Sequence, residues 1–150
     1  MRLCPKSRLD TPRRRACPYC CPDCQGCAHP MNLRLLLVDD DQDTRRMLSA
    51  LLGAEGYDLI PADSVREGLR LAEAEEFDLY VLDFKFAEGS GKELCQRIRR
   101  FDPHTPILFF SASHPRLQEE ALTCGAQGFV LKPDINALRA EIRKYLDRVA

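Results

Sequence analysis

Short apolar runs alternate with amphipathic segments along the chain from Met31 onward. Each run has the length of a β-strand and consists largely of aliphatic and aromatic residues, which is typical of strands buried on both faces. The predicted strands are Leu33–Val38, Tyr57–Ala62, Phe77–Leu82, Pro106–Phe110 and Gly128–Leu131. Several of these runs stop at a polar residue, for example at Asp39, Asp83 and Ser111.

A helix is predicted after each strand, because apolar residues recur there at intervals of three and four positions. The expected apolar faces comprise Met47, Leu48, Leu51 and Leu52; Val65, Leu69 and Leu71 (or Ala72); Leu94, Cys95 and Ile98; and Ile135, Leu138, Ile142, Tyr145 (or Leu146) and Val149. The fourth of the five helices is expected over Pro115–Cys124. Ser64 is a suitable N-cap for the second helix, and Gly125, which has no Cβ, suits a left-handed C-cap of the fourth.

Five strands that alternate with five helices predict an α/β fold with a five-stranded parallel sheet between two layers of helices. Right-handed crossovers place helices on both faces of such a sheet. The carboxyl ends of the strands then meet at one edge, where ligands of open α/β sheets bind. Candidate functional residues are therefore expected directly after the strands.

The composition changes near residue 30. Residues 1–30 hold five prolines and six of the eight cysteines, and their six basic and two acidic residues give a charge of +4. Residues 31–150 hold the other 16 basic and 21 acidic residues, a charge of −5. The first segment has few large aliphatic residues and no regular period, so it cannot bury enough apolar surface to fold by itself. We expect a disordered leader or a misassigned start over residues 1–30, and one domain over residues 31–150.

The leader cysteines allow several metal sites. Cys17, Cys20, Cys24 and Cys27 form two C-x₂-C pairs, but the pairs are closer together than in a zinc ribbon. Cys21, Cys24 and Cys27 match the start of a bacterial iron–sulfur motif whose fourth cysteine is absent. Cys17, Cys21 and Cys24 also have the spacing of a radical-enzyme cluster motif. The sequence leaves the type of metal open, and a segment without any metal remains the simpler interpretation.

Charge and hydropathy exclude several classes of function. The formal net charge of −1 provides no basic excess for binding nucleic acid through its phosphates. No apolar stretch approaches the ~20 residues that span a bilayer, and residues 1–30 lack the apolar core of a secretory signal. Cys95 and Cys124 stand alone within helical patterns and are expected to be buried thiols. We expect a cytoplasmic protein without specific nucleic-acid binding or membrane insertion.

Five polar residues stand at the ends of predicted strands: Asp39, Asp40, Asp83, Ser111 and Lys132. Clustered carboxylates repel one another unless a cation is close, and Mg²⁺ binds one or two carboxylates together with phosphate oxygens. A lysine and a hydroxyl at the same edge suit the charged oxygens of a phosphoryl group in transfer. Taken singly, the residues also fit structural roles, as N-caps, a turn residue and a strand exit. Their common place at one edge favours a phosphoryl site.

Residues 31–150 resemble the receiver domain of bacterial two-component response regulators. The matching segments are Leu-Leu-Val-Asp39-Asp40 followed by Arg45 and Arg46, Asp83 with Gly91 eight positions later, Pro-Ile-Leu-Phe-Phe-Ser111-Ala112, Ala121-Leu122-x-x-Gly125-Ala126, and Gly128-Phe129-Val130-Leu131-Lys132-Pro133. The resemblance implies a flavodoxin-like sheet with the strand order 2-1-3-4-5, as in the chemotaxis receiver.

The resemblance also implies roles for individual residues. Asp83 would accept a phosphoryl group from the phosphohistidine of a histidine kinase or phosphotransfer protein. Lys132 and Ser111 would contact phosphoryl oxygens, and Phe129 would turn inward as Ser111 moves toward the phosphate. The implied Mg²⁺ ligands are Asp40, Asp83 and the backbone carbonyl of Lys85, with Asp39 assisting through water. The segment departs from the family pattern at Phe86 and Ala87, where Met-Pro is frequent, and at Ser111, where threonine is common.

Three classes of function follow. The first is a stand-alone phospho-receiver that catalyses only its own phosphorylation and dephosphorylation and signals to a downstream protein by contact, since no output segment follows the receiver pattern. The alternative is an adaptor with the receiver fold that is not phosphorylated, and the complete set of site residues argues against it. A phosphatase with an Asp-x-Asp nucleophile is disfavoured, because Lys85 stands where its general acid would be.

Overall fold

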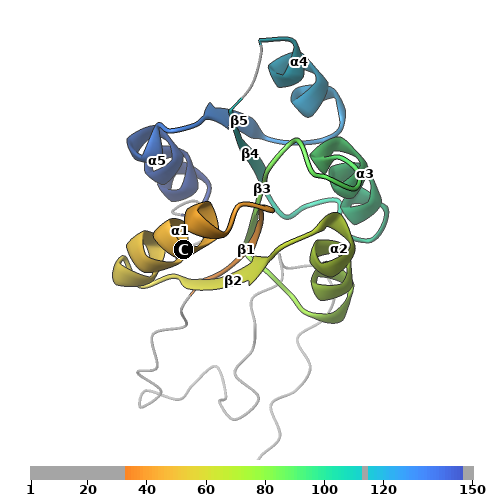
Figure 1. Cartoon of the computed structure of the whole chain (residues 1–150). Helices are drawn as coiled ribbons and strands as arrows, with labels where there is room; N and C mark the ends of the chain where they lie inside the picture. The colour runs from red at the N-terminus through yellow and green to blue at the C-terminus, as the bar shows by residue number, and fades with distance from the viewer. Residues whose placement is uncertain (1–32, 113–114, 147–150) are drawn as a thin grey trace, which may run out of the picture. The chain divides into compact units, whose positions relative to one another are not determined.

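The computed structural model describes residues 33–112 and 115–146. Strands and helices alternate along the described chain, as Figure 1 shows. The strands are β1 (Arg34–Val38), β2 (Asp58–Ala62), β3 (Leu79–Leu82), β4 (Ile107–Ser111) and β5 (Gly128–Leu131). The helices are α1 (Gln42–Ala54), α2 (Val65–Ala74), α3 (Gly91–Phe101), α4 (Pro115–Thr123) and α5 (Ile135–Leu146). Each predicted strand and helix is present, with small shifts at the ends.

The five strands form one parallel sheet with the order β2-β1-β3-β4-β5. The predicted α/β class and strand order are therefore confirmed. The chain leaves β1 for β2 on one side and then crosses to β3 on the other side of β1. This reversal creates the topological switch point at which open α/β sheets bind ligands.

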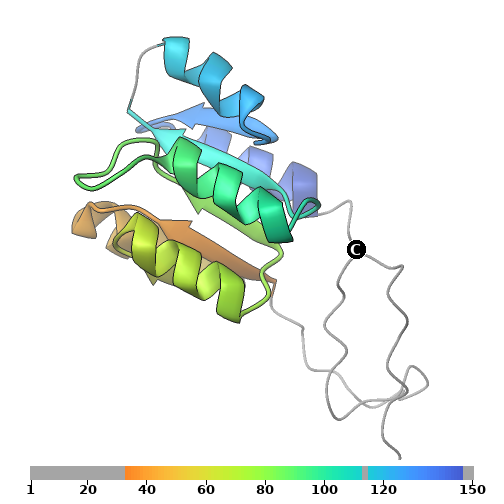
Figure 2. The ribbon, with the colours of Figure 1, turned by 90° about the vertical axis from the view of Figure 1, so that its right-hand side faces the viewer.

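Helices cover both faces of the sheet. Helices α1 and α5 lie on one face, and α2, α3 and α4 lie on the other, as the two views in Figures 1 and 2 show. Each face has its own apolar cluster, because successive strand residues point to opposite sides. On the strands, the first cluster includes Leu36, Val38, Tyr80, Leu82, Ile107 and Phe109, and the second includes Leu35, Leu37, Leu79, Val81, Leu108 and Phe110. The sheet is thus buried on both sides along its central strands.

The predicted capping residues of α2 and α4 are present at the ends of these helices. The Ser64 hydroxyl accepts a hydrogen bond from the Glu67 amide (3.1 Å) at the start of α2. Gly125, two residues beyond the end of α4, has a φ of +103°. That left-handed conformation is unfavourable for residues with a Cβ, which explains the glycine.

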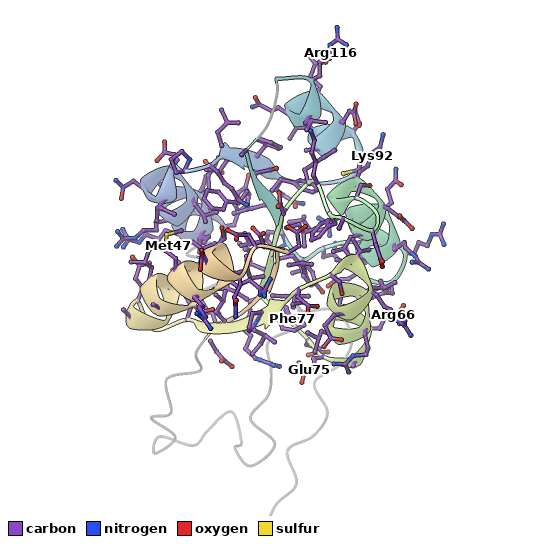
Figure 3. All side chains as sticks on the ribbon, viewed as in Figure 1. Met47, Arg66, Glu75, Phe77, Lys92 and Arg116 are labelled. Atoms are coloured by element: carbon purple, nitrogen blue, oxygen red, sulfur yellow. The ribbon has the colours of Figure 1, made fainter. Side chains whose placement is uncertain are left out.

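Two of the predicted core residues of α1 are at the surface, and that prediction was wrong. Met47 and Leu51 are 41% and 39% exposed, and Figure 3 shows Met47 on α1. The helix turns a single row, Thr44, Leu48 and Leu52, toward the sheet. Met47 and Leu51 precede members of this row by one position, which rotates them by about 100° away from it.

In α2 and α5, the structure decides between neighbouring candidates. Ala72 is buried in α2, whereas Leu71 is only half-buried. In α5, Leu146 is buried, and the half-buried Tyr145 donates its hydroxyl hydrogen to the Gln127 carbonyl oxygen (3.0 Å). The predicted leader, with Cys17, Cys20, Cys24 and Cys27, lies outside the described residues, as does Val149. None of the helices in the described ranges combines the length and apolar character needed to cross a bilayer.

Candidate functional site

The backbone register brings the ends of β1 and β3 together. Val38 of β1 is paired with Leu82 of β3, and the Asp83 amide donates to the Val38 carbonyl oxygen (2.9 Å). Asp39 and Asp83 therefore leave the sheet side by side, although they are far apart in sequence. Their common position follows from the parallel pairing of the two strands, because parallel strands end at the same edge.

The ends of β4 and β5 reach the same edge. Ser111 is paired with Leu131, and the Lys132 amide donates to the Ser111 carbonyl oxygen (3.1 Å). Ser111 is buried, with 2% of its surface exposed. Since β4 pairs with β3, the hydroxyl-bearing residue stands one strand away from Asp83 and directly beside the strand that carries Lys132.

The Lys132 ammonium joins the two aspartates. Its Nζ lies 2.7 Å from Asp39 Oδ2 and 3.4 Å from Asp83 Oδ2. Burial lowers the pKa of Lys132, but hydrogen bonds and charge attraction from Asp39 and Asp83 outweigh this effect and raise it above its ordinary value. The lysine is therefore held in its charged form between two carboxylates.

Three carboxylates could hold a metal ion here. One oxygen from each of Asp39, Asp40 and Asp83 lies within 4.8 Å of the other two. Asp39 and Asp83 are buried, whereas Asp40 is exposed. An all-oxygen set with two or three carboxylates fits a hard cation such as Mg²⁺, which keeps several water ligands.

The electrostatics of the cluster favour an added cation. Burial, followed by repulsion from Asp83, raises the pKa of Asp39 above its ordinary value, even though Lys132 and the Asp41 amide donate hydrogen bonds to it. One ammonium group thus does not compensate for the clustered negative charge. A divalent cation between the carboxylates would remove this repulsion.

The three consecutive aspartates after β1 have different environments. Asp41 is the N-cap of α1, and it accepts hydrogen bonds from the Thr44 hydroxyl (2.5 Å) and the Thr44 amide (3.2 Å). These bonds lower the pKa of Asp41. Of the three aspartates, Asp41 therefore has the structural role of an N-cap. Asp39 and Asp40 remain available to the carboxylate cluster. An aspartate directly before a helical pattern was the sequence signal for this cap.

The backbone around Asp83 needs a glycine on α3. Gly91 is the first residue of α3, and a Cβ added there would lie 2.0 Å from the Asp83 carbonyl oxygen. The Asp83 carboxylate also accepts a hydrogen bond from the Phe84 amide (2.7 Å). Gly91 therefore allows the start of α3 to pack against the loop that presents Asp83. The sequence pattern contained Gly91, but its steric role is visible only in the structure.

The loop after Asp83 is fixed at Lys85. The backbone of Lys85 forms an antiparallel bridge with Ser90, the N-cap of α3. The Lys85 side chain is exposed. The bridge restrains the backbone at the residue whose carbonyl was expected to bind Mg²⁺.

Arg45 supports the site from α1, a contact that sequence reasoning missed. Its guanidinium donates to the Asp39 carbonyl oxygen (2.7 Å). The contact joins residues six positions apart around the start of the helix, so the apolar pattern carries no signal for it. Arg45 thereby fixes the backbone from which the Asp39 carboxylate extends.

Phe129, the expected switch residue, is half-buried on β5. Its ring stacks on that of Phe109 in β4, with a centroid distance of 6.3 Å and an interplanar angle of 28°. The two residues are partners in the strand register. Phe129 is thus close to β4, which ends at Ser111, and its ring retains an exposed part.

Comparisons with known proteins agree with this geometry. Residues 35–143 match the family model of the response regulator receiver domain. The transcriptional regulatory protein ZraR of Escherichia coli K12 is 35% identical over 117 residues, which cover 77% of this chain and 26% of ZraR. The chain thus spans about a quarter of the length of the curated relatives that it matches first.

Solved structures show the same fold. A CheY-like receiver domain protein from Methanospirillum hungatei has a TM-score of 0.75 and 28% identity, over 79% of this chain and 96% of that protein. The response regulator TrrA of Thermotoga maritima, solved with Mg²⁺ and BeF, has a TM-score of 0.69 and 28% identity, over 75% of this chain and 98% of that protein.

Proposed function

Since this chain belongs to the response regulator receiver domain family, we propose that it is phosphorylated on Asp83 at the cluster described above. Receiver domains are signalling modules of two-component systems rather than metabolic enzymes. The proposal is carried by one observation: Lys132 Nζ contacts both Asp39 and Asp83, and the Asp39, Asp40 and Asp83 carboxylates lie within 4.8 Å of one another.

Asp83 is the proposed nucleophile. An Asp83 carboxylate oxygen attacks the phosphorus of a phosphohistidine, the phosphorus–nitrogen bond breaks, and an acyl phosphate forms on Asp83. The proposed donor is a histidine kinase or a phosphotransfer protein. The Phe84 amide donates a hydrogen bond to Asp83 Oδ1, which orients the carboxylate and leaves Oδ2 facing the Lys132 ammonium.

The donor set fits Mg²⁺, with Asp40 and Asp83 as direct ligands, the Lys85 carbonyl as a third, and Asp39 acting through water. Bound there, the ion would neutralise charge on the phosphoryl oxygens and on the carboxylates. Lys132 would exchange part of its contact with Asp83 for a phosphoryl oxygen. Its short hydrogen bond to Asp39 keeps the ammonium in place during this exchange.

Ser111 and Phe129 are the proposed output of the site. The Ser111 hydroxyl would donate to a phosphoryl oxygen, and its movement would leave room for the Phe129 ring to turn inward. The stacking of Phe129 on Phe109 and the adjacent ends of β4 and β5 support this coupling. The surface around α4, β5 and α5 would then present a different face to a downstream protein.

We further propose that the chain catalyses only its own phosphorylation and dephosphorylation, that it signals through protein contact, and that it resides in the cytoplasm. The free thiols of Cys95 and Cys124 support a reducing compartment. The alternative function is an adaptor that binds partners through the receiver fold without phosphorylation.

Incubation with Mg²⁺ and a small acyl phosphate, followed by intact-mass measurement, distinguishes the two functions. We expect one phosphoryl adduct that alkali removes, that requires Mg²⁺, and that Asp83→Asn abolishes. Asp58→Asn is the matched control, because Asp58 is an exposed aspartate on β2 that pairs with Arg34 (3.3 Å) away from the cluster. Folded protein that forms no adduct, with either the acyl phosphate or a histidine kinase, would support the adaptor.

A further inference from the structure

Two thiols that phosphoryl transfer does not use lie against each other between α3 and the end of α4. Cys95 Sγ in α3 donates to the Cys124 carbonyl oxygen (3.3 Å), and Cys124 Sγ donates to the Ala121 carbonyl oxygen (3.0 Å). Both side chains belong to the same buried cluster. Cys95 is fully buried, Cys124 is 7% exposed, and both are free thiols.

We propose that Cys95 and Cys124 are a redox modification site, at which a low-molecular-weight disulfide such as oxidised glutathione converts the two thiols into an intramolecular disulfide. The site is distinct from the carboxylate cluster and does not depend on phosphorylation. It would link α3 covalently to the residue that follows α4.

Cys95 and Cys124 have different roles in the proposed disulfide exchange. The interaction with the Cys95 side chain, together with the Ala126 amide and the charge of Lys92, lowers the pKa of Cys124 to about 7 despite burial. The interaction with Cys124, followed by burial, raises the pKa of Cys95. Cys124 is also the more exposed of the two and follows the last residue of α4, whereas Cys95 is fully buried within α3. Since the thiolate is the nucleophile in disulfide exchange, Cys124 is the attacking residue and Cys95 is the resolving residue.

Cys124 is buried, but it lies at the end of a helix whose opening would expose it. It directly follows Thr123, the last residue of α4, and the neighbouring Leu122, Thr123 and Gly125 are exposed. Opening of the last turn of a helix requires far less free energy than global unfolding. Lys92, at the start of α3 (Figure 3), adds a positive charge that acts on Cys124 and attracts an anionic disulfide.

The reaction balances in two exchanges. The Cys124 thiolate attacks one sulfur of the small disulfide, and the other sulfur leaves as a thiolate. Cys95 then loses its proton to water, and its sulfur attacks Cys124 Sγ and releases the second thiolate. The two protein thiols are oxidised, and the small disulfide is reduced to two thiols.

The elements to be linked are already joined by other contacts. Arg99 of α3 donates from Nε (3.0 Å) and Nη2 (2.9 Å) to the carbonyl oxygen of Gly125, the residue after Cys124. Lys92 of α3 pairs with Glu120 of α4 (4.0 Å). These contacts hold α3 and the end of α4 next to each other, so the disulfide would link elements that are already neighbours.

The test is oxidation of the full chain under native conditions with oxidised glutathione, followed by thiol blocking, trypsin digestion and mass spectrometry. Cleavage after Lys92, Arg97 and Arg116 places the two cysteines on different peptides and separates both from the leader cysteines. We expect a linked peptide pair that has lost both thiol hydrogens and that reductant separates. Hydrogen exchange of the α4 amides should slow in the oxidised protein.

Two variants assign the order of events. Cys95→Ala should accumulate a glutathione adduct on Cys124, because no resolving thiol remains, and Cys124→Ala should protect Cys95 from modification. Lys92→Gln should slow adduct formation on Cys124 several-fold at low salt. The proposal is overturned if the linked pair is absent, if it forms only in denaturant, or if only leader cysteines react while the protein stays folded.

Discussion

Asp39 and Asp102 are both almost completely buried, with 1% and 3% of their surfaces exposed, and they lie at opposite edges of the sheet. Asp39 follows the carboxyl end of β1, whereas Asp102 follows α3, shortly before β4 begins. The surroundings of the two carboxylates shift their pKa values in opposite directions. The pKa of Asp39 is raised, and that of Asp102 is lowered.

The environment of Asp102 satisfies its charge completely. Its carboxylate accepts hydrogen bonds from the Thr105 hydroxyl (2.7 Å), the Thr105 and His104 amides (3.1 and 3.3 Å) and the Tyr80 hydroxyl (3.1 Å). Burial raises the pKa of Asp102, but these donors together outweigh it. A carboxylate held by several donors stabilises a turn and leaves nothing for a ligand to add.

The environment of Asp39 leaves its charge incompletely compensated. It accepts hydrogen bonds from the Asp41 amide (2.9 Å) and Lys132 (2.7 Å), but Asp83 and Asp40 lie in the same cluster. The comparison shows that burial alone does not distinguish a structural aspartate from a functional one. The distinguishing feature is the balance between hydrogen-bond donors and like charges around the carboxylate.

The largest effect on stability is expected from Asp102→Ala. Removal of the carboxylate breaks the hydrogen bonds that it accepts from the Thr105 hydroxyl and from the His104 and Thr105 amides, so we expect the free energy of unfolding to fall by about 3 kcal/mol. Chemical denaturation measures the change. The folded variant should still be phosphorylated on Asp83, and loss of phosphorylation without loss of stability would contradict the separation of the two regions.

The largest effect on chemistry after loss of Asp83 itself is expected from Lys132→Met. Without the ammonium, charge on the transferring phosphoryl group is less well neutralised, and the rate should fall about 100-fold. The rate of adduct formation with a small acyl phosphate provides the measurement. Lys144→Met, which removes an exposed lysine whose ammonium lies over the Tyr145 ring, is the control and should react at the wild-type rate.

Gly91→Ala should give a smaller loss of phosphorylation rate. The new methyl group would collide with the Asp83 carbonyl oxygen, so the loop must shift, and we expect the rate to fall about tenfold. Gly53→Ala is the matched control, because no other group lies within 4 Å of a Cβ at that helical position. It should stabilise the protein by about 0.5 kcal/mol and leave the rate unchanged. Equal rates in both variants would show that the Asp83 loop tolerates displacement.

The smallest effect is expected for Asp39→Asn, and its pH dependence has a defined sign. Because the folded pKa of Asp39 is raised, its contribution to stability is fully present below the ordinary aspartate pKa and is lost as the pH rises through the folded value. Without Mg²⁺, Asp39→Asn should therefore exceed the wild type by about 1 kcal/mol at neutral pH. Denaturation curves at several pH values should show this difference shrinking as the pH falls.

Asp102→Asn should give the opposite pattern. Because its folded pKa is lowered, Asp102 contributes stability above the ordinary aspartate pKa and loses it as the pH falls through the folded value. The variant should therefore be less stable than the wild type at neutral pH, with the deficit shrinking toward acid pH. Parallel profiles for Asp39→Asn and Asp102→Asn would contradict the distinction between the two aspartates.

The apolar pattern was sufficient to predict the helices and strands, because the hydrophobic period differs between the two. The pattern was less accurate for residues beside the buried face of a helix. Met47 and Leu51 fit the helical period but are exposed, since α1 turns one narrow row toward the sheet. The width of a buried stripe depends on the elements that pack against it, which a single helix sequence does not contain.

The carboxylate cluster was predictable for a different reason. Asp39 and Asp83, like the neighbouring Lys132, directly follow strands. A parallel sheet places the carboxyl ends of its strands at one edge, so the alternation of strands and helices along the sequence was enough to predict that these residues meet there. The role of Asp102 was not predictable in this way. Its donors come from Tyr80 in β3 and from the turn that it begins, and only packing brings the Tyr80 hydroxyl to the carboxylate.

The amino-acid sequence by itself determined the class of fold and the set of groups at one edge of the sheet, because these depend on periodicity and on the handedness of the backbone. The tertiary structure decided which buried carboxylate is compensated and which is not, how closely Gly91 approaches Asp83, and that Cys95 meets Cys124. These properties depend on distances of a few ångströms between residues far apart in sequence, and such distances are fixed only when side chains from different elements pack together.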